Sequence, residues 1–302
     1  MNVALLYSAN LDPDNPEART DRFEFDEEVG ALTPAFAARG LTLEPRLWDD
    51  AASYAGEYDA LLPLMVWDYF EGNEARFLAT MEAASERTRV FNTPATLRWN
   101  SDKRYLEGLA AKGAPVIPTV SVAAVTEGGA REAARSFDTD RLVIKPQIGG
   151  GAWRQVLWSV HDPWPQDDAL PPGDALIQPF LPSIQAEGEY SLLFFGGRFS
   201  HALQKLAKGG DYRIQSSYGG REVKVEPSEE VLGVARAVLA SLDDTPLYAR
   251  VDLIRGLDGA LALIEIELIE PYLYLPMAEV GADGLNTGAV MLAEALKARL
   301  SG

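Results

Sequence analysis

The sequence predicts an α/β protein in which a parallel sheet is followed by antiparallel hairpins. Over about the first 95 residues, apolar runs alternate with helical patterns, which is typical of a doubly wound parallel-sheet domain. From about residue 140, strand-like runs follow one another across glycine turns, which favours antiparallel pairing. The last hairpin carries acidic residues inside otherwise apolar strands: Asp252, Glu265 and Glu267.

The doubly wound N-terminal domain is expected over residues 1–95. Strands are predicted at 2–9, 41–48, 58–67 and 90–92, and helices at 26–39 and 72–87. Such a sheet binds ligands at the carboxyl ends of its strands, where the sequence places Ser8, Asn10 and the run Trp67-Asp68-Tyr69. No Gly-x-Gly-x-x-Gly fingerprint follows the first strand, so we expect no dinucleotide there.

A linker helix and a small central domain are expected over residues 96–180. Asn92-Thr93-Pro94 is predicted to break the chain. Asn100-Ser101-Asp102 is predicted to cap a helix that runs from about 103 to 112 and ends at Gly113. The remaining predicted elements of this domain are strands at 116–124, 141–146, 153–160 and 175–181 and a helix at 129–137.

A glycine turn, Gly149-Gly150-Gly151, joins two of these strands. Without Cβ atoms, the backbone N–H groups of such a turn can approach an anion closely. Lys145 lies in the apolar strand just before the turn, and an inward-pointing lysine needs an anionic partner. The alternative is an ordinary turn beside a lysine that reaches the surface from a strand end.

The C-terminal domain is expected over residues 181–302. The predicted elements are strands at 190–195 and 199–206, a helix at 228–242 capped by Ser228, the acidic hairpin within 246–275 and a helix at 285–300. A glycine-bounded loop at 209–220 carries Tyr212 and Arg213.

The acidic hairpin points to metal chemistry. Side chains alternate between the two faces of a strand, so Glu265 and Glu267 point the same way. Two carboxylates held close repel each other, and a hard divalent cation relieves this repulsion by binding their oxygens. The alternative is a solvated polar face of an antiparallel sheet.

Composition excludes several classes of function. The net charge of -18 argues against a nucleic-acid or anionic-membrane partner. The absence of cysteine excludes disulfides, thiolate metal sites and cysteine nucleophiles, and the histidines, His161 and His201, are too few for a His-rich zinc site. The first residues have neither the basic start nor the cleavage site of a signal peptide, so we expect a cytoplasmic protein.

A series of motifs from about residue 92 onward resembles, in sequence and order, the ATP-grasp carboxylate-amine ligases. They are Asp102-Lys103, Val143-Ile144-Lys145-Pro146 with its glycine turn, Gln178-Pro179-Phe180-Leu181, Gly188-Glu189-Tyr190-Ser191, Gly209-Gly210-Asp211-Tyr212-Arg213, Arg250-Val251-Asp252 and Glu265-Ile266-Glu267. The loop at 209–220 resembles the substrate loop of glutathione synthetases and RimK-type ligases.

A narrower resemblance is to the branch of cycloserine-forming cyclo-ligases, which close O-ureido-serine into a ring. The motifs that carry it are Trp67-Asp68-Tyr69, the run 98–106, Phe199-Ser200-His201-Ala202 and Glu267-Leu268-Ile269-Glu270-Pro271. That branch tends to have Ser-Thr where Met65-Val66 stands, and Ser-Ala-Gly in the glycine turn. It also tends to have small or aliphatic residues where Tyr272 and Tyr274 stand. These positions, with Trp153 and Arg154 after the glycine turn, are expected to line the acceptor site.

The resemblance implies ATP as a cofactor, bound between the central lid domain and the C-terminal domain. Lys103 and Lys145 would hold its phosphates beside the glycine turn. Glu189 would bind the ribose hydroxyls. The adenine would lie among Gln178, Phe180 and Leu181.

The resemblance also implies Mg²⁺ or Mn²⁺ on Asp252, Glu265 and Glu267. The family usually has asparagine where Glu267 stands, and Glu270 is an alternative ligand. Three cations are the candidate catalytic residues: Arg250, Lys205 and Arg213. The candidate substrate residues are Trp67, Asp68, Tyr69, Tyr212, Glu270 and Tyr272.

The expected reaction has two steps. A substrate carboxylate attacks the γ-phosphoryl group of ATP to give an acyl phosphate and ADP, and an amine then displaces phosphate. The expected partners are small-molecule carboxylates and amines, and a homodimer is compatible with the resemblance. Two alternatives are an ATP-binding or kinase-like protein without ligase turnover, and a two-lobed sugar or amino-acid binder. The identity of the substrates and the choice between ligation and cyclisation stay open.

Overall fold

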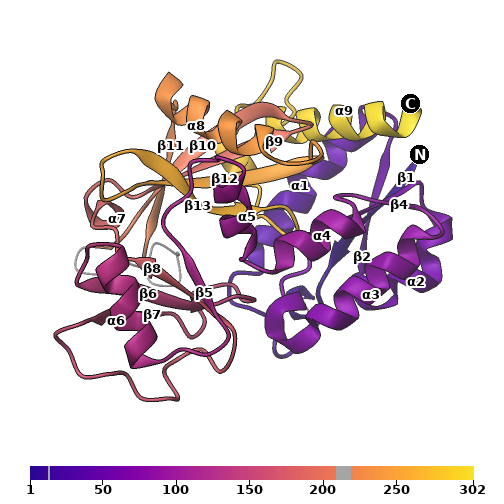
Figure 1. Ribbon diagram of the computed structural model, residues 1–302. Helices are drawn as coiled ribbons and strands as arrows, with labels where there is room; N and C mark the ends of the chain where they lie inside the picture. The colour runs from indigo at the N-terminus through magenta and orange to yellow at the C-terminus, as the bar shows by residue number, and fades with distance from the viewer. Residues whose placement is uncertain (13, 209–218) are drawn as a thin grey trace.

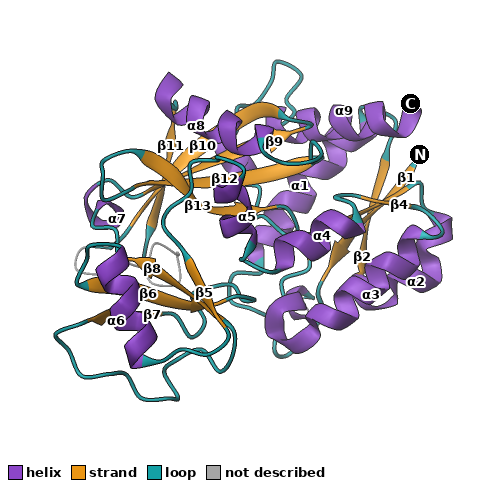
Figure 2. Cartoon of the chain, viewed as in Figure 1, coloured by secondary structure: helices purple, strands orange, loops and turns teal. Residues whose placement is uncertain are grey.

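The computed structural model describes residues 1–12, 14–208 and 219–302. Its strands form one parallel and two antiparallel sheets (Figure 1). Figure 2 shows the helices lying against the faces of these sheets. In the part of the chain that is described, no helix is long and apolar enough to cross a membrane.

The N-terminal sheet is parallel and has the strand order β2-β1-β3-β4. Its strands are β1 (Asn2–Tyr7), β2 (Thr42–Leu47), β3 (Ala60–Met65) and β4 (Arg89–Val90), and its helices are α1 (Phe23–Ala37), α2 (Ala51–Tyr54) and α3 (Glu74–Ser85). Val3 and Leu5 pack into the core that contains α1, whereas Ala4 and Leu6 pack into the core that contains α2 and α3. The predicted doubly wound arrangement is therefore confirmed.

The predicted break at Asn92-Thr93-Pro94 is present as an irregular segment after β4, but Pro94 also begins a helix that was not predicted. In α4 (Pro94–Ser101), Thr93 Oγ1 accepts a hydrogen bond from the Thr96 N–H at 3.3 Å. Pro94 takes a position in the first turn of the helix, where the N–H that proline lacks would have had no partner. We interpreted this motif only as a break, but a proline that follows a capping residue is also a typical start of a helix.

The predicted cap at Asn100-Ser101-Asp102 is wrong for Asn100. Asp102 Oδ1 does accept a hydrogen bond from the N–H of Arg104 at 2.9 Å, just before the next helix, α5 (Tyr105–Ala111), whose N-cap residue Arg104 makes no capping bond of its own. Asn100 is buried and its amide is used elsewhere. It donates to the Ile266 carbonyl at 2.8 Å and accepts from the Leu268 N–H at 2.7 Å. The Asn100 side chain thus attaches α4 to the acidic hairpin.

The small sheet is antiparallel, with the order β5-β8-β6-β7. Its strands are β5 (Val120–Val122), β6 (Arg141–Pro146), β7 (Val156–Ser159) and β8 (Ala175–Pro179). The helix α6 (Glu127–Ser136) buries its alanine face, Ala130, Ala133 and Ala134, against Leu142 and Ile177. The glycine turn joins the paired strands β6 and β7, as predicted.

The large sheet is antiparallel, with the order β11-β10-β9-β12-β13. Its elements are β9 (Glu189–Phe195), β10 (Arg198–Leu206), β11 (Arg221–Val225), β12 (Tyr248–Arg255), β13 (Leu261–Glu267), α7 (Ser183–Ala186), α8 (Glu229–Ala240) and α9 (Thr287–Ser301). Leu192 and Phe194 face the core that contains α8, and Leu193 and Phe195 face the core that contains α9. Strand β11 was not predicted, since its sequence, Arg-Glu-Val-Lys-Val, is mostly polar.

One hydrophobic core joins the parallel sheet to the large antiparallel sheet. It combines residues of β1 and α1 with residues of β9 and α9, and Figure 1 shows α1 and α9 side by side. A smaller apolar cluster joins the small sheet to the large one through Ile117, Phe180 and Ile254. Both junctions border the cavities described next.

Candidate active site

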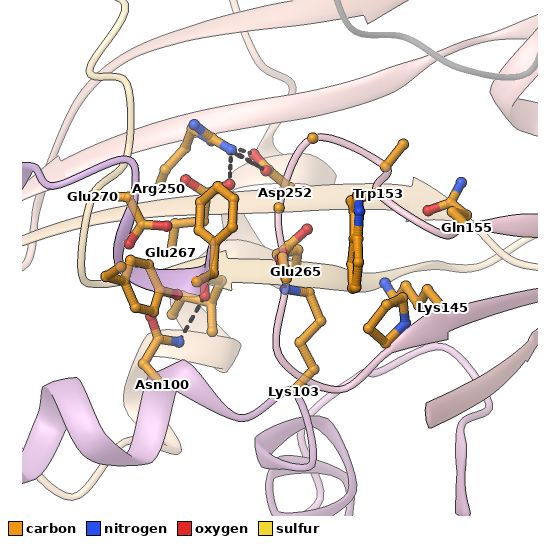
Figure 3. Close-up of a pocket in the computed structure, with 18 of the residues that line it drawn as sticks. Asn100, Lys103, Lys145, Trp153, Gln155, Arg250, Asp252, Glu265, Glu267 and Glu270 are labelled. Atoms are coloured by element: carbon orange, nitrogen blue, oxygen red, sulfur yellow. Dashed lines mark hydrogen bonds and ion pairs between the residues drawn. The ribbon is translucent and has the colours of Figure 1, made fainter. Parts of the chain in front are cut away.

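A cavity of about 820 Å³ is lined by residues that belong to, or follow, strands of each of the three sheets (Figure 3). One wall comes from the acidic hairpin and from Glu189 and Lys205 of the neighbouring strands. A second wall comes from Lys145 and the glycine turn. The N-terminal part of the chain closes it with Arg19, Asp21, Glu24 and residues 69–72.

The acidic hairpin has the predicted arrangement. Asp252 pairs with Glu265 across β12 and β13, and Arg250 pairs with Glu267. Glu265 and Glu267 both line the cavity, as expected from the alternation of side chains along a strand. Asp252 is buried and accepts hydrogen bonds from Ser191 Oγ at 2.6 Å and Arg250 Nε at 3.1 Å. Arg250 also forms an ion pair with Glu267.

The lysines of the cavity differ in their partners. Lys103 Nζ lies 2.6 Å from the Gly149 carbonyl oxygen and 3.1 Å from Glu265, so it ties the glycine turn to the hairpin. Lys205 Nζ lies 3.2 Å from Glu189 and 3.4 Å from Asp252. Lys145 is buried, and no described residue pairs with its ammonium group.

Burial and ion pairing pull the pKa values of these carboxyls in opposite directions. Burial raises the pKa of Glu267 to about 7 despite the nearby Arg250. Burial also raises the pKa of Glu189 to about 7, against the attraction of Lys205. For Glu265 burial is outweighed by Lys103 and Lys145, which hold its pKa below the usual value. Arg250 and Lys205 likewise lower the pKa of Asp252.

The hairpin carboxylates supply the oxygen donors that Mg²⁺ and Mn²⁺ prefer. Asp252, Glu265 and Glu267 line one cavity, and Glu270 lines it too. Within the described residues, no three His, Cys, Asp or Glu side chains are arranged as a group that could hold a metal ion. Each of the hairpin carboxylates is instead ion-paired with a lysine or an arginine. The donor set fits a hard cation, provided that these cationic side chains move toward an incoming anion.

A second, narrower cavity of about 110 Å³ adjoins the first and shares Lys145, Gln155, Glu189 and Glu265 with it. Its other lining residues are mostly apolar: Ile117, Val143, Gln178, Pro179, Phe180, Leu181, Ile184, Ile254 and Ile264. The predicted adenine residues Gln178, Phe180 and Leu181 are thus brought together. A narrow, mostly apolar slot with the Gln178 amide in its wall is suited to a planar heterocyclic ring.

The candidate substrate residues divide into two groups. Tyr69 and Glu270 line the large cavity, whereas Trp67, Asp68 and Tyr272 do not. The side chains of this second group bond inside the protein. Trp67 Nε1 donates to the Glu270 carbonyl at 3.1 Å, Asp68 accepts from Trp48 Nε1 at 2.7 Å, and the Tyr272 hydroxyl donates to Glu27 at 2.6 Å. Tyr212 and Arg213 lie outside the described residues.

Sequence reasoning missed several lining residues: Arg19, Asp21, Glu24, Phe70, Gln155 and Glu222. Trp153 and Tyr274, which were expected near the acceptor site, also line the cavity. Arg19, Asp21 and Glu24 follow β1, so the rule that ligands bind at strand ends pointed to their segment. No local pattern marked Gln155 or Glu222. A Cβ at Gly150 would lie 2.9 Å from the Phe70 ring, so this glycine allows the turn to contact the N-terminal part of the chain.

A family model described as the N-terminal domain of D-cycloserine synthetase DcsG matches residues 3–92. The chain is 34% identical over 291 residues to the cycloserine biosynthesis protein DcsG of Streptomyces lavendulae, covering 90% of this chain and 95% of that protein. The crystal structure of D-cycloserine synthetase DcsG superposes with a TM-score of 0.81 at 29% identity, covering 99% of this chain and 100% of the other.

A more distant likeness extends to a D-alanine–D-alanine ligase from Bacillus anthracis. Its crystal structure superposes with a TM-score of 0.66 at 15% identity, covering 100% of this chain and 99% of that chain. At this identity the likeness concerns the fold alone.

Proposed function

The chain belongs to the D-cycloserine synthetase family of ATP-grasp carboxylate-amine ligases, and from this premise we propose that it closes an amino-acid derivative of the O-ureido-serine type into a cycloserine-like ring. The chain is an ATP-dependent ligase that activates a carboxylate and forms a carbon-nitrogen bond. The observation that carries the proposal is the 34% identity along 95% of a cycloserine biosynthesis protein.

We place the nucleotide across the two adjoining cavities. The apolar slot around Phe180 and Leu181 suits the adenine ring, and Glu189, which lines both cavities, suits the ribose between them. The phosphates would then extend toward Lys145, whose buried ammonium group has no partner among the described residues. A buried cation that no carboxylate contacts directly is stabilised by a bound anion, and this supports the placement.

Asp252, Glu265 and Glu267 would hold Mg²⁺, which neutralises charge on the phosphoryl oxygens when it is bound. Lys103, which bonds Gly149 and Glu265, is within the same cavity and would join Lys145 on the phosphates. Arg250 and Lys205 both contact Asp252, so their positive charges lie beside the transferred group and the acid that receives it.

In the first step an oxygen of the substrate carboxylate bonds to the γ-phosphorus, the bond from that phosphorus to the β,γ-bridging oxygen breaks, and ADP leaves. In the second step the substrate nitrogen that is bonded to oxygen attacks the acyl carbon, the bond from that carbon to the phosphate oxygen breaks, phosphate leaves, and the nitrogen loses a proton. Water must then remove the carbamoyl group from the ring nitrogen, as carbon dioxide and ammonia, to give the free ring. The acyl phosphate must be kept from water between these steps. The contact of the glycine turn with Phe70 and the position of Trp153 at the cavity support such an enclosure.

The test is to incubate the purified protein with ATP, Mg²⁺ and O-ureido-D-serine, and to measure ADP, phosphate and the cyclic product. We expect ADP and ring product in equal amounts. Serine and O-methylserine are matched controls, because each keeps the carboxylate but lacks the nitrogen bonded to the side-chain oxygen. ADP release that requires a second, separate amine would instead show an intermolecular ligase. Nucleotide binding without turnover on any amino acid or dipeptide would favour the ATP-binding alternative.

A further inference from the structure

Thr119 does not line either cavity, yet it bonds to the amide that faces the adenine slot. Gln178 is buried and its Nε2 lies 2.9 Å from Thr119 Oγ1. Thr119 Oγ1 in turn lies 3.0 Å from the carbonyl oxygen of Ile117. Ile117 is itself buried and its side chain lines the same slot. The three residues form a short chain of hydrogen bonds behind the wall of the slot.

The direction of these bonds follows from donor and acceptor chemistry. A carbonyl oxygen only accepts, so the single hydroxyl hydrogen of Thr119 goes to Ile117. The Thr119 oxygen must then accept, and only the NH₂ group of Gln178 is able to donate to it. No other described group donates to the Ile117 carbonyl, so turning the hydroxyl toward Gln178 would leave a buried carbonyl without a partner.

The amide of Gln178 is therefore held with Nε2 toward Thr119 and with Oε1 as the group that remains for a ligand. No described residue donates a hydrogen bond to this oxygen. An acceptor at this position matches the exocyclic amino group of adenine, which is a donor. It opposes guanine or hypoxanthine, which present a carbonyl oxygen at the same ring position.

We infer that Thr119 is a positioning residue that determines the nucleotide base, by fixing Gln178 in the orientation that accepts a hydrogen bond from adenine. The inference rests on the proposed placement of the nucleotide and adds to it a specificity determinant outside the cavity wall. Without the Thr119 hydroxyl, the Gln178 amide is free to rotate and to present its NH₂ group, which suits a carbonyl-bearing base.

The experiment compares ATP with ITP, which carries a carbonyl oxygen in place of the exocyclic amino group that Gln178 would read and a hydrogen on the neighbouring ring nitrogen, N1. Binding is measured by calorimetry, and turnover by product formation, for the wild-type protein, Thr119→Ser and Thr119→Val. Thr119→Ser keeps the hydroxyl and is expected to keep the ATP preference. Thr119→Val keeps the shape and is expected to reduce the ratio of ATP affinity to ITP affinity by about tenfold or more. Thr119→Ala is the second variant, in case valine disturbs packing.

Each outcome decides between two explanations. A purely structural role for Thr119 would weaken ATP and ITP binding by the same factor, and an unchanged ratio in Thr119→Val and Thr119→Ala overturns the inference. A wild-type protein that binds both nucleotides equally also overturns it, while leaving the ligase function in place. A wild-type protein that binds neither nucleotide contradicts the nucleotide placement itself. A change of ratio in Thr119→Val that is absent in Thr119→Ser supports the inference.

Discussion

His201 Nε2 lies 2.9 Å from the carbonyl oxygen of Leu273, and the N–H of the same leucine donates to Glu28 of α1. Because the carbonyl accepts, Nε2 carries the proton, and Nδ1 accepts from Ser200 Oγ at 2.9 Å. His201 and Glu28 thus both hydrogen-bond the backbone of Leu273, one at its carbonyl oxygen and the other at its N–H. The next residue, Tyr274, has a left-handed backbone, and its ring centroid lies 5.5 Å from Lys205 Nζ in the active-site cavity.

The pH dependence of stability should report the neutral state of His201. Burial lowers its pKa to about 4, from about 6.5 in an unfolded chain. Between these pH values the unfolded chain binds more protons than the folded protein does. The free energy of unfolding of the protein therefore falls as pH falls from about 6.5 toward 4. Relative to neutral pH, the free energy of unfolding is lower by about 3 kcal/mol once His201 is protonated in both states. The free energy of unfolding, measured with urea at several pH values in this range, should change less with pH in His201→Gln than in the wild-type protein. An equal pH dependence in both proteins would contradict the prediction.

Replacement of Lys145 should abolish catalysis without harming the fold. We expect Lys145→Met to reduce ADP release by about 100-fold or more, because the phosphates lose a fixed positive charge. The melting temperature of the ligand-free protein should stay level or rise, since the variant no longer buries an unpaired ammonium group. Lys112→Met, at the exposed end of α5, is the control that should change neither quantity. Normal ADP release by Lys145→Met would falsify the phosphate role.

The hairpin carboxylates should be needed for metal-dependent turnover. Activity is expected to require Mg²⁺ or Mn²⁺, and Glu265→Gln and Glu267→Gln should each reduce it severely, because a hard cation loses an anionic ligand. The shift of melting temperature by ATP with Mg²⁺, relative to ATP alone, gives a readout that does not need turnover. Glu57→Gln, an exposed surface change, is the matched control. Full turnover in excess chelator would show that these glutamates are only a polar strand face.

Lys205 and Arg213 are predicted to act on the acid substrate rather than on ATP. We expect Lys205→Ala and Arg213→Ala to raise the apparent KM for the acid or lower kcat, by ~30- to 1000-fold, for a lost charged contact of about 2 to 4 kcal/mol. Lys205 also neutralises Glu189 and Asp252, so Lys205→Arg, which keeps the charge, should retain stability. Calorimetry decides the question: a collapse of ATP affinity with an unchanged KM for the acid would place both residues in the nucleotide site.

Asn100 should stabilise the folded protein through its bonds to Ile266 of β13 and to Leu268, which follows that strand. We expect Asn100→Ala to lower the free energy of unfolding by about 2 to 4 kcal/mol, because a buried N–H and a buried C=O lose their partner. Chemical denaturation measures this loss. Asn73→Ala, whose amide bonds at a more exposed position, is expected to cost less. Equal losses of unfolding free energy in the two variants would show that the bonds of Asn100 stabilise the protein no more than those of Asn73.

Local patterns were sufficient where a single period determines the direction of a side chain. Glu265 and Glu267 followed from the alternation along one strand. The residues of the apolar slot at 178–181 came instead from the resemblance to ATP-grasp ligases. The direction of side chains in irregular segments could not be predicted. Tyr69 and Glu270 line the cavity while their motif neighbours Trp67 and Tyr272 do not, because a turn does not repeat.

Contacts between residues that are distant in the sequence could not be predicted from the sequence alone either. Asn100 looked like a helix cap, because its short amide side chain suits a cap as well as it suits a strand edge. Its bonds to Ile266 and Leu268 depend on how α4 packs, which no local pattern reports. The role of Thr119 depends in the same way on its position beside Gln178.

The hydrogen bonds along the outer side of β13 also protect the protein from unwanted association. Strand β13 ends the large sheet, and an open strand edge invites pairing with another chain. Here Leu263 pairs with the backbone of Pro115 and Ile117, Ile266 with the Tyr105 hydroxyl and Asn100, and Leu268 with Asn100 and Asn92. The strand that carries Glu265 and Glu267 therefore offers little template for aggregation or for a sheet that continues into a second molecule.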